Sequence, residues 1–199
     1  MDISVFNSLT KKKDNFTTKE KGLIKWYTCG PTVYDVAHLG HARTFLTFDI
    51  IRRILEDYFN YEIIYIMNIT DIDDKIIEKL NKMPDINKAN YQDKFQTLTR
   101  YFEKDFFVDM KALNIKEPTV VCRVSEYIDK IIKYIQELQN QQFAYESNGS
   151  VYFDIVEYTK RGYNIEPLKK IPTGDDAGDA PNSSNHFKDE KKNPEDFVL

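Results

Sequence analysis

The chain has 199 residues, with 28 Lys and Arg against 32 Asp and Glu and a formal net charge of −4. Its length fits one domain or one and a part, and 41% hydrophobic with 30% charged residues excludes a disordered tail, a collagen and a coiled-coil rod. Two cysteines exclude a disulfide scaffold, and with neither a signal-like nor a membrane-spanning apolar run we expect a cytoplasmic protein without a membrane partner.

The first predicted elements form a parallel crossover. Leu23–Thr28 is an aromatic-rich buried strand, and from His38 onward apolar side chains recur at steps of four, which is typical of a helix. Ile63–Met67 is a second buried strand, and Asp73–Leu80 begins another helix. A strand–helix–strand unit of this length connects parallel strands. The pattern therefore predicts half of a nucleotide-binding sheet.

The middle of the chain differs in character. We expect a long helix from Tyr91 to Leu113, a helix from about Ser125 to Gln141, and a hairpin turning at Asn148-Gly149. The predicted fold class is α/β, with the first half of a Rossmann-like parallel sheet in residues 1–112. A mixed α+β inserted, or connective, module follows in residues 113–172.

The last residues combine a linker with an apolar end. Residues 173–196 contain seven acids and three lysines, so their net charge of −4 equals that of the whole chain. Their composition predicts an acidic flexible linker. Residues 197–199 resemble the start of a strand. Because apolar strands seldom begin at a terminus, we expect a truncated strand and a fragment of a longer protein.

A histidine pair is the first candidate site. His38 and His41 flank Gly40 at the predicted start of a helix, where unpaired N–H donors and the helix dipole favour phosphate. Gly40 would let a nucleotide approach the backbone. Capping or packing histidines remain the alternative.

Three carboxylates follow the second strand. Asp71, Asp73 and Asp74 lie where open α/β sheets bind ligands, but the sequence lacks the Gly and Glu of a calcium loop. Helix capping by Asp71 or Asp73 is expected. Cys29 follows the first strand; a lone Cys is more often a small buried hydrophobe, and its spacing from the histidines does not match a zinc finger. Cys122 is interpreted as structural.

With these positions placed, three blocks resemble the signature motifs of cysteinyl-tRNA synthetases: Tyr27–Asp35, His38–Phe45 and Asn68–Ile77. A weaker similarity continues through Asp109–Asn114, Arg123–Ile128, Gly149–Phe153 and Asn193–Leu199. The resemblance covers nearly the whole chain in order. The wording Ser125-Glu126-Tyr127 is closest to the eukaryotic cytosolic branch.

The resemblance implies a class I synthetase that converts L-cysteine and ATP, used with Mg²⁺, to cysteinyl-adenylate and transfers cysteine to the 3′ end of tRNA(Cys). It implies catalytic His38 and His41, which stabilise the α-phosphate. Amino-acid contacts fall on Gly30, Thr32 and Thr70, and the first ligand of a Zn²⁺ ion falls on Cys29. The implied ATP-binding motif comprises Pro31, Thr32, Val33, Tyr34, Asp35, His38, Leu39, Gly40 and His41.

The family pattern continues past Leu199 with the remaining zinc ligands and a phosphate-binding loop. Since one ligand cannot hold the metal, we expect these 199 residues alone to be inactive. Two alternatives remain open. One is a ligase that joins activated cysteine to a small amine, and the other is a non-catalytic nucleotide-binding module.

Overall fold

The computed structural model describes residues 3–165 and 190–199. Two compact units make up the chain: the sheet body, Thr18–Ile128, and the hairpin body, Met1–Thr17 with Asp129–Leu199. We describe each body by itself.

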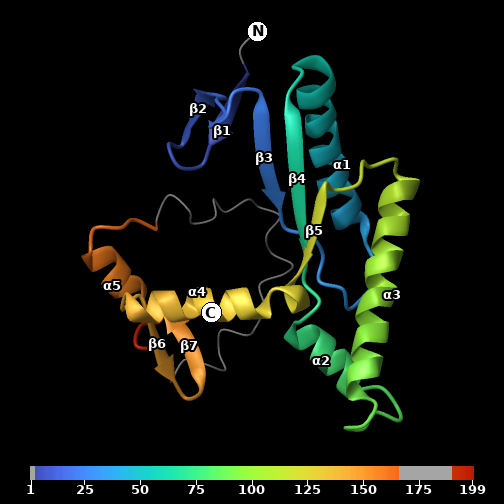
Figure 1. Cartoon of the computed structure of the whole chain (residues 1–199), viewed down its shortest axis with the longest axis vertical. Helices are drawn as coiled ribbons and strands as arrows, with labels where there is room; N and C mark the ends of the chain where they lie inside the picture. The colour runs from blue at the N-terminus through green and yellow to red at the C-terminus, as the bar shows by residue number, and fades with distance from the viewer. Residues whose placement is uncertain (1–2, 166–189) are drawn as a thin grey trace. The chain divides into compact units, whose positions relative to one another are not determined.

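The sheet body is built on three parallel strands in the order β3-β4-β5 (Figure 1). β3 (Leu23–Thr28) pairs with β4 (Glu62–Ile69), and β4 pairs with β5 (Val120–Arg123). α1 (Leu39–Arg53) connects β3 to β4 and continues into a π-helical turn, Ile54–Tyr58. The predicted strands, the crossover helix and the α/β fold class are confirmed.

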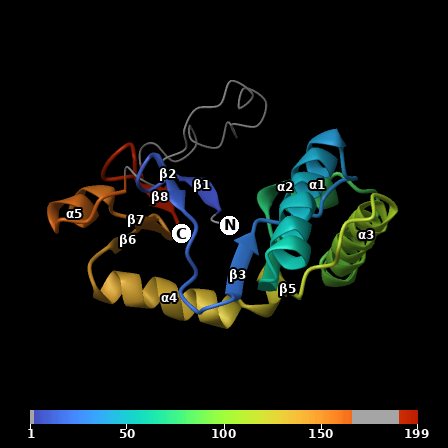
Figure 2. The ribbon, with the colours of Figure 1, turned by 90° about the horizontal axis from the view of Figure 1, so that it is seen from above.

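α2 (Asp74–Asn81) and α3 (Tyr91–Ala112) follow β4. Figures 1 and 2 show α1 and α3 on one face of the parallel sheet. Trp26 of β3 lies edge-on to Phe48 of α1, with ring centroids 5.8 Å apart. Phe45 of α1 lies 5.2 Å from Phe106 of α3 in the same way. The periodic apolar positions of both helices thus form the core on this face.

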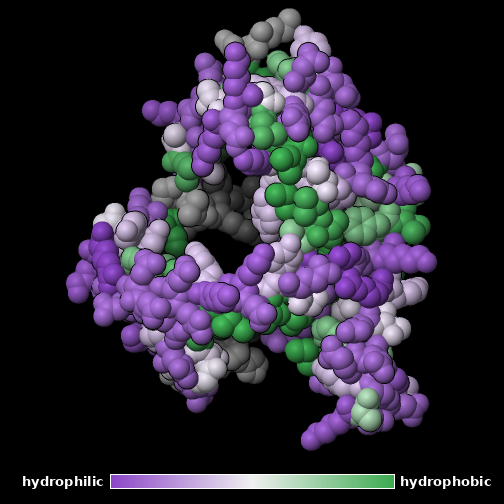
Figure 3. Space-filling model, viewed as in Figure 1, coloured by the Kyte–Doolittle hydropathy of each residue, from purple (hydrophilic) through white to green (hydrophobic). Residues whose placement is uncertain are grey.

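The opposite face of the sheet exposes side chains. The side chains of Val120 and Tyr27 are 39% and 59% exposed. Figure 3 shows a hydrophobic area over these strands. Alternation along β3 therefore gives this face Tyr27 and, at the strand's end, Cys29.

A second core lies beyond the carboxyl end of β4. Ile69, Ile76 and Leu80 have no measurable exposure. They pack with Leu98 and Phe102 of α3. Burying these apolar residues holds the end of β4, α2 and α3 in fixed positions, which matters because the candidate site residues follow the strand ends.

The short strand β5 lies within the predicted inserted module. The sequence places residues 113–172 in one inserted module, but Val120–Arg123 pair in parallel with Ile66–Ile69. The sheet body runs to Ile128. Thr119 fixes this pairing, since its N–H donates to the Tyr65 oxygen and its hydroxyl accepts from the Tyr65 N–H.

The hairpin body contains two antiparallel sheets. β1 (Ser4–Asn7) and β2 (Lys12–Asn15) form one, and β6 (Ala144–Ser147), β7 (Ser150–Phe153) and β8 (Phe197–Val198) form the other. The predicted Asn148-Gly149 turn is confirmed, with φ of 51° and 83°, as expected for a tight hairpin.

Two helices complete the hairpin body, α4 (Ile128–Asn140) and α5 (Ile155–Lys160). The sequence predicts α4 from about Ser125, but Val124–Glu126 form a 3₁₀ turn before it. Residues 173–189 of the predicted linker lie outside the described residues. The described segment Glu190–Asp196 hydrogen-bonds to the hairpin, as Glu190 accepts from Tyr152 and Asp196 from Tyr145. In the described ranges, 3–165 and 190–199, we find no helix long and apolar enough to cross a bilayer.

Candidate functional site

The candidate residues lie where β3 and β4 end. Residues after β3 stay beside the end of β4 through a parallel bridge between Thr32 and Thr70. The Val33 N–H donates to the Thr70 oxygen at 3.1 Å, and the Thr70 N–H donates to the Pro31 oxygen at 3.1 Å. Two of the predicted amino-acid contacts, Thr32 and Thr70, are thereby neighbours at the carboxyl edge of the sheet.

Gly30 allows the chain to cross close to β4. A Cβ atom built on Gly30 would lie 1.9 Å from the main-chain oxygen of Asn68 and 2.8 Å from Cγ of Met67. Any side chain would push the strands apart. The Gly30 N–H donates to Oδ1 of Asn68 at 2.9 Å, so the turn is held where it approaches most closely.

Cys29 is exposed at this edge, not a buried hydrophobe. Its sulfur lies 3.8 Å from the hydroxyl of Tyr27, which donates to Oδ1 of Asn68 at 3.1 Å. Burial and the neighbouring thiol raise the pKa of Tyr27, so the phenol keeps its proton. An exposed thiol beside a fixed phenol is accessible to a ligand, whereas Cys122 is part-buried and donates toward the Tyr127 hydroxyl at 3.8 Å.

His38 and His41 cap the N-terminus of α1 reciprocally. Nδ1 of His38 accepts from the Gly40 N–H at 3.0 Å, and Nδ1 of His41 accepts from the His38 N–H at 3.2 Å. The two rings are stacked with centroids 3.9 Å apart. Because an Nδ1 acceptor carries no proton, each neutral ring has its proton on Nε2. The structure thus shows the capping role, and in each ring Nε2 is the nitrogen that the cap does not use, near the positive end of the helix dipole.

Gly40 has a local role that the sequence did not indicate. A Cβ atom there would lie 2.8 Å from Cε1 and 2.9 Å from Nδ1 of His38. The glycine therefore leaves space for the capping imidazole. Leu39 beside it is 84% exposed, so the start of α1 is open to solvent in the structure.

Lys79 of α2 fixes the turn that precedes the histidines. Its ammonium donates to the Tyr34 main-chain oxygen at 2.6 Å and to Oδ1 of Asp35 at 3.4 Å, and it lies 4.3 Å from the centre of the Phe102 ring. A hydrogen bond from the Val36 N–H, followed by the Lys79 charge, lowers the pKa of Asp35. Sequence reasoning missed Lys79, since the partner is a distant main-chain oxygen.

The three carboxylates after β4 divide their roles. Asp73 caps α2 by accepting from the Lys75 N–H at 2.8 Å, as expected for one of them. Asp71 is buried and accepts instead from the N–H and the hydroxyl of Ser125, at 2.9 and 2.5 Å. These bonds fasten the turn after β5 to the end of β4.

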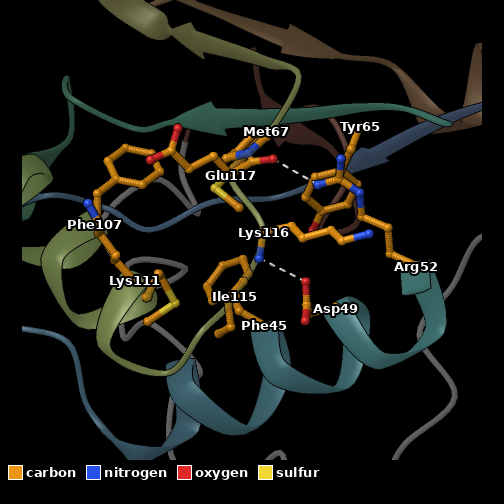
Figure 4. Close-up of a pocket in the computed structure, with 12 residues that line it drawn as sticks. Phe45, Asp49, Arg52, Tyr65, Met67, Phe107, Lys111, Ile115, Lys116 and Glu117 are labelled. Atoms are coloured by element: carbon orange, nitrogen blue, oxygen red, sulfur yellow. Dashed lines mark hydrogen bonds between the residues drawn. The ribbon is translucent and has the colours of Figure 1, made fainter. Parts of the chain in front are cut away.

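A small cavity elsewhere in the sheet body is structural. It lies between α1, β4 and the segment before β5, with a volume of about 20 Å³ (Figure 4), room for about one water molecule. Asp49 points into it and accepts from the Lys116 N–H at 2.9 Å, while Arg52 donates to the Glu117 oxygen at 2.8 Å. It is too small for a nucleotide.

The described residues do not form a zinc site by themselves. Structural zinc takes four ligands and catalytic zinc takes three from the protein. In residues 3–165 and 190–199, no group of three or more His, Cys, Asp or Glu side chains is placed to hold a metal ion. Cys29 is a single candidate thiolate.

Comparison with known proteins gives one consistent result. The sequence profile of a family described as "tRNA synthetases class I (C) catalytic domain" matches residues 15–199. The chain is 44% identical over 197 residues to a protein named cysteine–tRNA ligase from Encephalitozoon cuniculi, covering 99% of this chain and 38% of that protein.

Other relatives agree. A cytoplasmic cysteine–tRNA ligase from Dictyostelium discoideum is 48% identical over 162 residues, covering 80% of this chain and 23% of the relative. A cysteine–tRNA ligase from Thermococcus onnurineus is 41% identical over 199 residues, with 100% and 38% covered. The chain thus spans well under half the length of these relatives. By the match of its sequence and its parallel sheet, the chain belongs to the family of class I (C) tRNA synthetase catalytic domains.

Proposed function

We propose that this chain forms the part of a cysteine–tRNA ligase that binds L-cysteine and ATP. The complete reaction joins the carboxylate of cysteine to the α-phosphate of ATP and releases pyrophosphate, and it then passes cysteine to the 3′ end of tRNA(Cys) and releases AMP. The observation that carries the proposal is the reciprocal histidine cap at the carboxyl edge of the sheet, which fixes both imidazole rings, stacked, at a helix N-terminus.

ATP is the ligand for the N-terminal end of α1. His38 and His41 act as the catalytic pair by donating from Nε2 to the α-phosphate, whose negative charge grows as the carboxylate attacks. Fixed donors of this kind stabilise the transition state without moving. The rest of the ATP-binding segment comprises Pro31, Thr32, Val33, Tyr34, Asp35, Leu39 and Gly40, and Mg²⁺ accompanies the nucleotide.

L-cysteine is the ligand for the edge between β3 and β4. Gly30, Thr32 and Thr70 lie together there through the bridge and the Asn68 side chain. Cys29 extends from the same turn and is exposed. We propose Cys29 as one ligand of a Zn²⁺ ion whose other ligands lie outside the described residues. A zinc ion binds a thiolate far better than a serine hydroxyl, which would supply selectivity for cysteine.

We place the protein in the cytoplasm and name tRNA(Cys) as its macromolecular partner. Support comes from relatives carrying the names cysteine–tRNA ligase and cysteine–tRNA ligase, cytoplasmic. The chain spans 38% of the first of these relatives, so we propose the tRNA step for the complete protein. We also propose the domain division at residues 112, 172 and 196 and assignment to the eukaryotic cytosolic branch.

The test is cysteine-dependent exchange between ATP and radioactive pyrophosphate, using the complete gene product. We expect exchange with cysteine and at least about a hundredfold less with serine. Added tRNA(Cys) should then become charged, whereas transfer only to a small amine would replace the tRNA step. No exchange with any amino acid would overturn the proposal in favour of a non-catalytic nucleotide-binding module.

Two further measurements address the metal. Metal analysis of the Cys29→Ser variant should give less zinc than the parent protein, while unchanged zinc content would remove Cys29 from the ligand set. Residues 1–199 expressed alone should show no exchange, because the described residues supply one exposed thiol, Cys29, and no group of three or more side chains placed to hold a metal ion. Exchange at the parent rate by this piece would overturn that expectation.

A further inference from the structure

Asn68 connects three parts of the candidate site through one side chain. Its Oδ1 accepts from the Gly30 N–H at 2.9 Å and from the Tyr27 hydroxyl at 3.1 Å, and its Nδ2 donates to the Thr70 hydroxyl at 3.3 Å. The amide lies on the half-exposed face of β4, Glu62–Ile69, whose neighbours on that face, Ile64 and Ile66, are apolar. Neither the sequence motifs nor the capping geometry assigned it a role.

The amide can lie in only one of its two orientations. A rotated amide would point Nδ2, a donor, at the Gly30 N–H, which is also a donor. The Gly30 main chain passes so close to β4 that a Cβ atom would clash with the Asn68 main-chain oxygen, and its N–H points at the Asn68 side chain. Oδ1 must therefore face Gly30, and Nδ2 must face Thr70.

This orientation determines what the Thr70 hydroxyl can do. A hydroxyl has one proton to donate and two lone pairs that accept. Since Nδ2 of Asn68 uses one lone pair, the Thr70 proton points away from Asn68. Thr70 thus presents an O–H donor and one remaining lone pair.

We propose that Asn68 is a positioning residue for the amino-acid substrate. It keeps the Thr70 proton available to an acceptor atom of the amino acid and holds the Gly30 turn against β4. The inference rests on the proposed function for the identity of the substrate, and it adds a residue and a hydrogen-bond direction to that site.

The variant Asn68→Asp tests the direction. Aspartate keeps the oxygen that faces Gly30 and Tyr27, but its second oxygen accepts where the amide donated, so the Thr70 proton turns toward Asp. In the exchange assay with the complete gene product, we expect KM for cysteine to rise about tenfold, as for the loss of one hydrogen bond. KM for ATP should stay within about twofold, because the histidine cap makes no use of Asn68.

A double-mutant cycle with Thr70→Val separates this role from a general structural one. If Asn68 acts through the Thr70 hydroxyl, Asn68→Asp should add less than about twofold to KM for cysteine in the Thr70→Val background. The exposed Asn81→Asp on α2 is the matched control and should leave both KM values unchanged. A full tenfold effect in the Thr70→Val background, or equal rises in both KM values, would overturn the proposal.

Amide hydrogen exchange provides a readout that does not depend on activity. Asn68→Ala should remove protection at the Gly30 N–H, while the N–H groups of Val33 and Thr70, bonded to main-chain oxygens, stay protected. Asn68→Asp should retain protection at Gly30. Unchanged Gly30 exchange in Asn68→Ala would overturn the positioning role, whereas a parent protein without cysteine-dependent exchange but with these amide changes would overturn only the proposed function.

Discussion

The sheet body and the hairpin body use polar side chains in opposite ways. In the hairpin body, Asp196 is 1% exposed and accepts from the Ile155 N–H at 3.0 Å, the Tyr145 hydroxyl at 2.8 Å and the Asn193 N–H at 3.1 Å. Burial raises the pKa of Tyr145 to about 12, so its phenol remains a donor. These three donors are all satisfied by one buried carboxylate.

At the edge of the sheet body, the inner atoms are bound and the outer atoms are left available. Nδ1 of His38 is used by the helix cap, and Nδ2 of Asn68 is used by Thr70. The opposite ends, Nε2 of His38 and the Thr70 proton, point away from these bonds. In the hairpin body, the polar atoms of Asp196 stabilise the fold. At the sheet edge, one polar atom of each side chain is hydrogen-bonded within the protein, and the other is oriented away from that bond.

The largest expected effect tests how closely the sheet edge is packed. Gly30→Ala should destabilise the sheet body by about 3 kcal/mol or more, because its Cβ would overlap main-chain atoms of β4. Trp26, the single tryptophan, lies in β3, so urea unfolding followed by its fluorescence reports on this body.

Gly22→Ala is the matched control. It has a φ of +79° but nothing within 4 Å of the added Cβ, so it should cost about 1 kcal/mol from backbone strain alone. Equal losses in the two variants would show that the close approach of Gly30 does not constrain the edge.

The next effect concerns the hairpin body. Asp196→Asn should lower the free energy of unfolding of the hairpin body by about 2–3 kcal/mol. The amide nitrogen of Asn would face N–H and O–H groups that donate to the carboxylate, and these groups would lose their acceptor. Exchange of the Ile155 amide should become faster, while the Trp26 unfolding transition stays the same. The exposed Glu195→Gln should change neither; loss of the Trp26 transition in Asp196→Asn would contradict the separation of the two bodies.

A smaller effect distinguishes the helix-capping role of His38 in the sheet body from its proposed role in catalysis. His38→Ala should cost about 1 kcal/mol of stability through loss of the N-cap. His38→Asn should restore the cap, since Asn caps helices well, yet both variants should lose about a hundredfold in exchange activity without the Nε2 donor. If His38→Asn recovered activity together with stability, the histidine would be only a cap.

The smallest effect is a pH dependence. Burial alone would raise the pKa of Glu103, but hydrogen bonds from Arg123 at 2.6 Å and Arg100 at 2.9 Å outweigh it and leave that pKa below its ordinary 4.5. A pKa lower in the folded than in the unfolded state adds stability above pH 4.5 that is lost as the pH falls through the folded value.

Urea unfolding of the sheet body should therefore become easier as the pH drops from about 5 toward 3. Glu103→Gln should be less stable at neutral pH and show a shallower fall over the same range. Parallel curves for the parent and the variant would mean that the two arginines do not hold Glu103 in its charged form.

Much of this fold was predictable because it follows from apolar periodicity. β3, β4, α1, α2 and α3 were located within a few residues, since buried positions repeat at two or near four along them. The four-residue β5 was missed, as its pairing depends on the distant contact of Thr119 with Tyr65. The Lys-rich hairpin of β1 and β2 was also missed, because its exposed strands lack an apolar pattern.

The sequence predicted which residues form the candidate site, but it did not predict the hydrogen bonds between them. The placement of His38 and His41 at a helix start is confirmed, but their reciprocal capping depends on ring orientation. Asn68 was expected to follow a strand that ends at Met67, whereas β4 extends to Ile69 and includes it. Its link to Gly30 is a contact between residues far apart in sequence, which sequence spacing does not reveal.

The most direct test compares the two cysteines in the exchange assay of the complete gene product. Cys29 is exposed at the end of β3, and Cys122 is part-buried on β5. Cys122 pairs in register with Asn68 of β4, and Cys29 directly follows Thr28, which pairs with Met67, so Cys122→Ser is a matched control. We predict that Cys29→Ser lowers kcat/KM for cysteine at least about a hundredfold and Cys122→Ser less than about threefold. Equal activities of the two variants would contradict a cysteine site at this edge of the sheet.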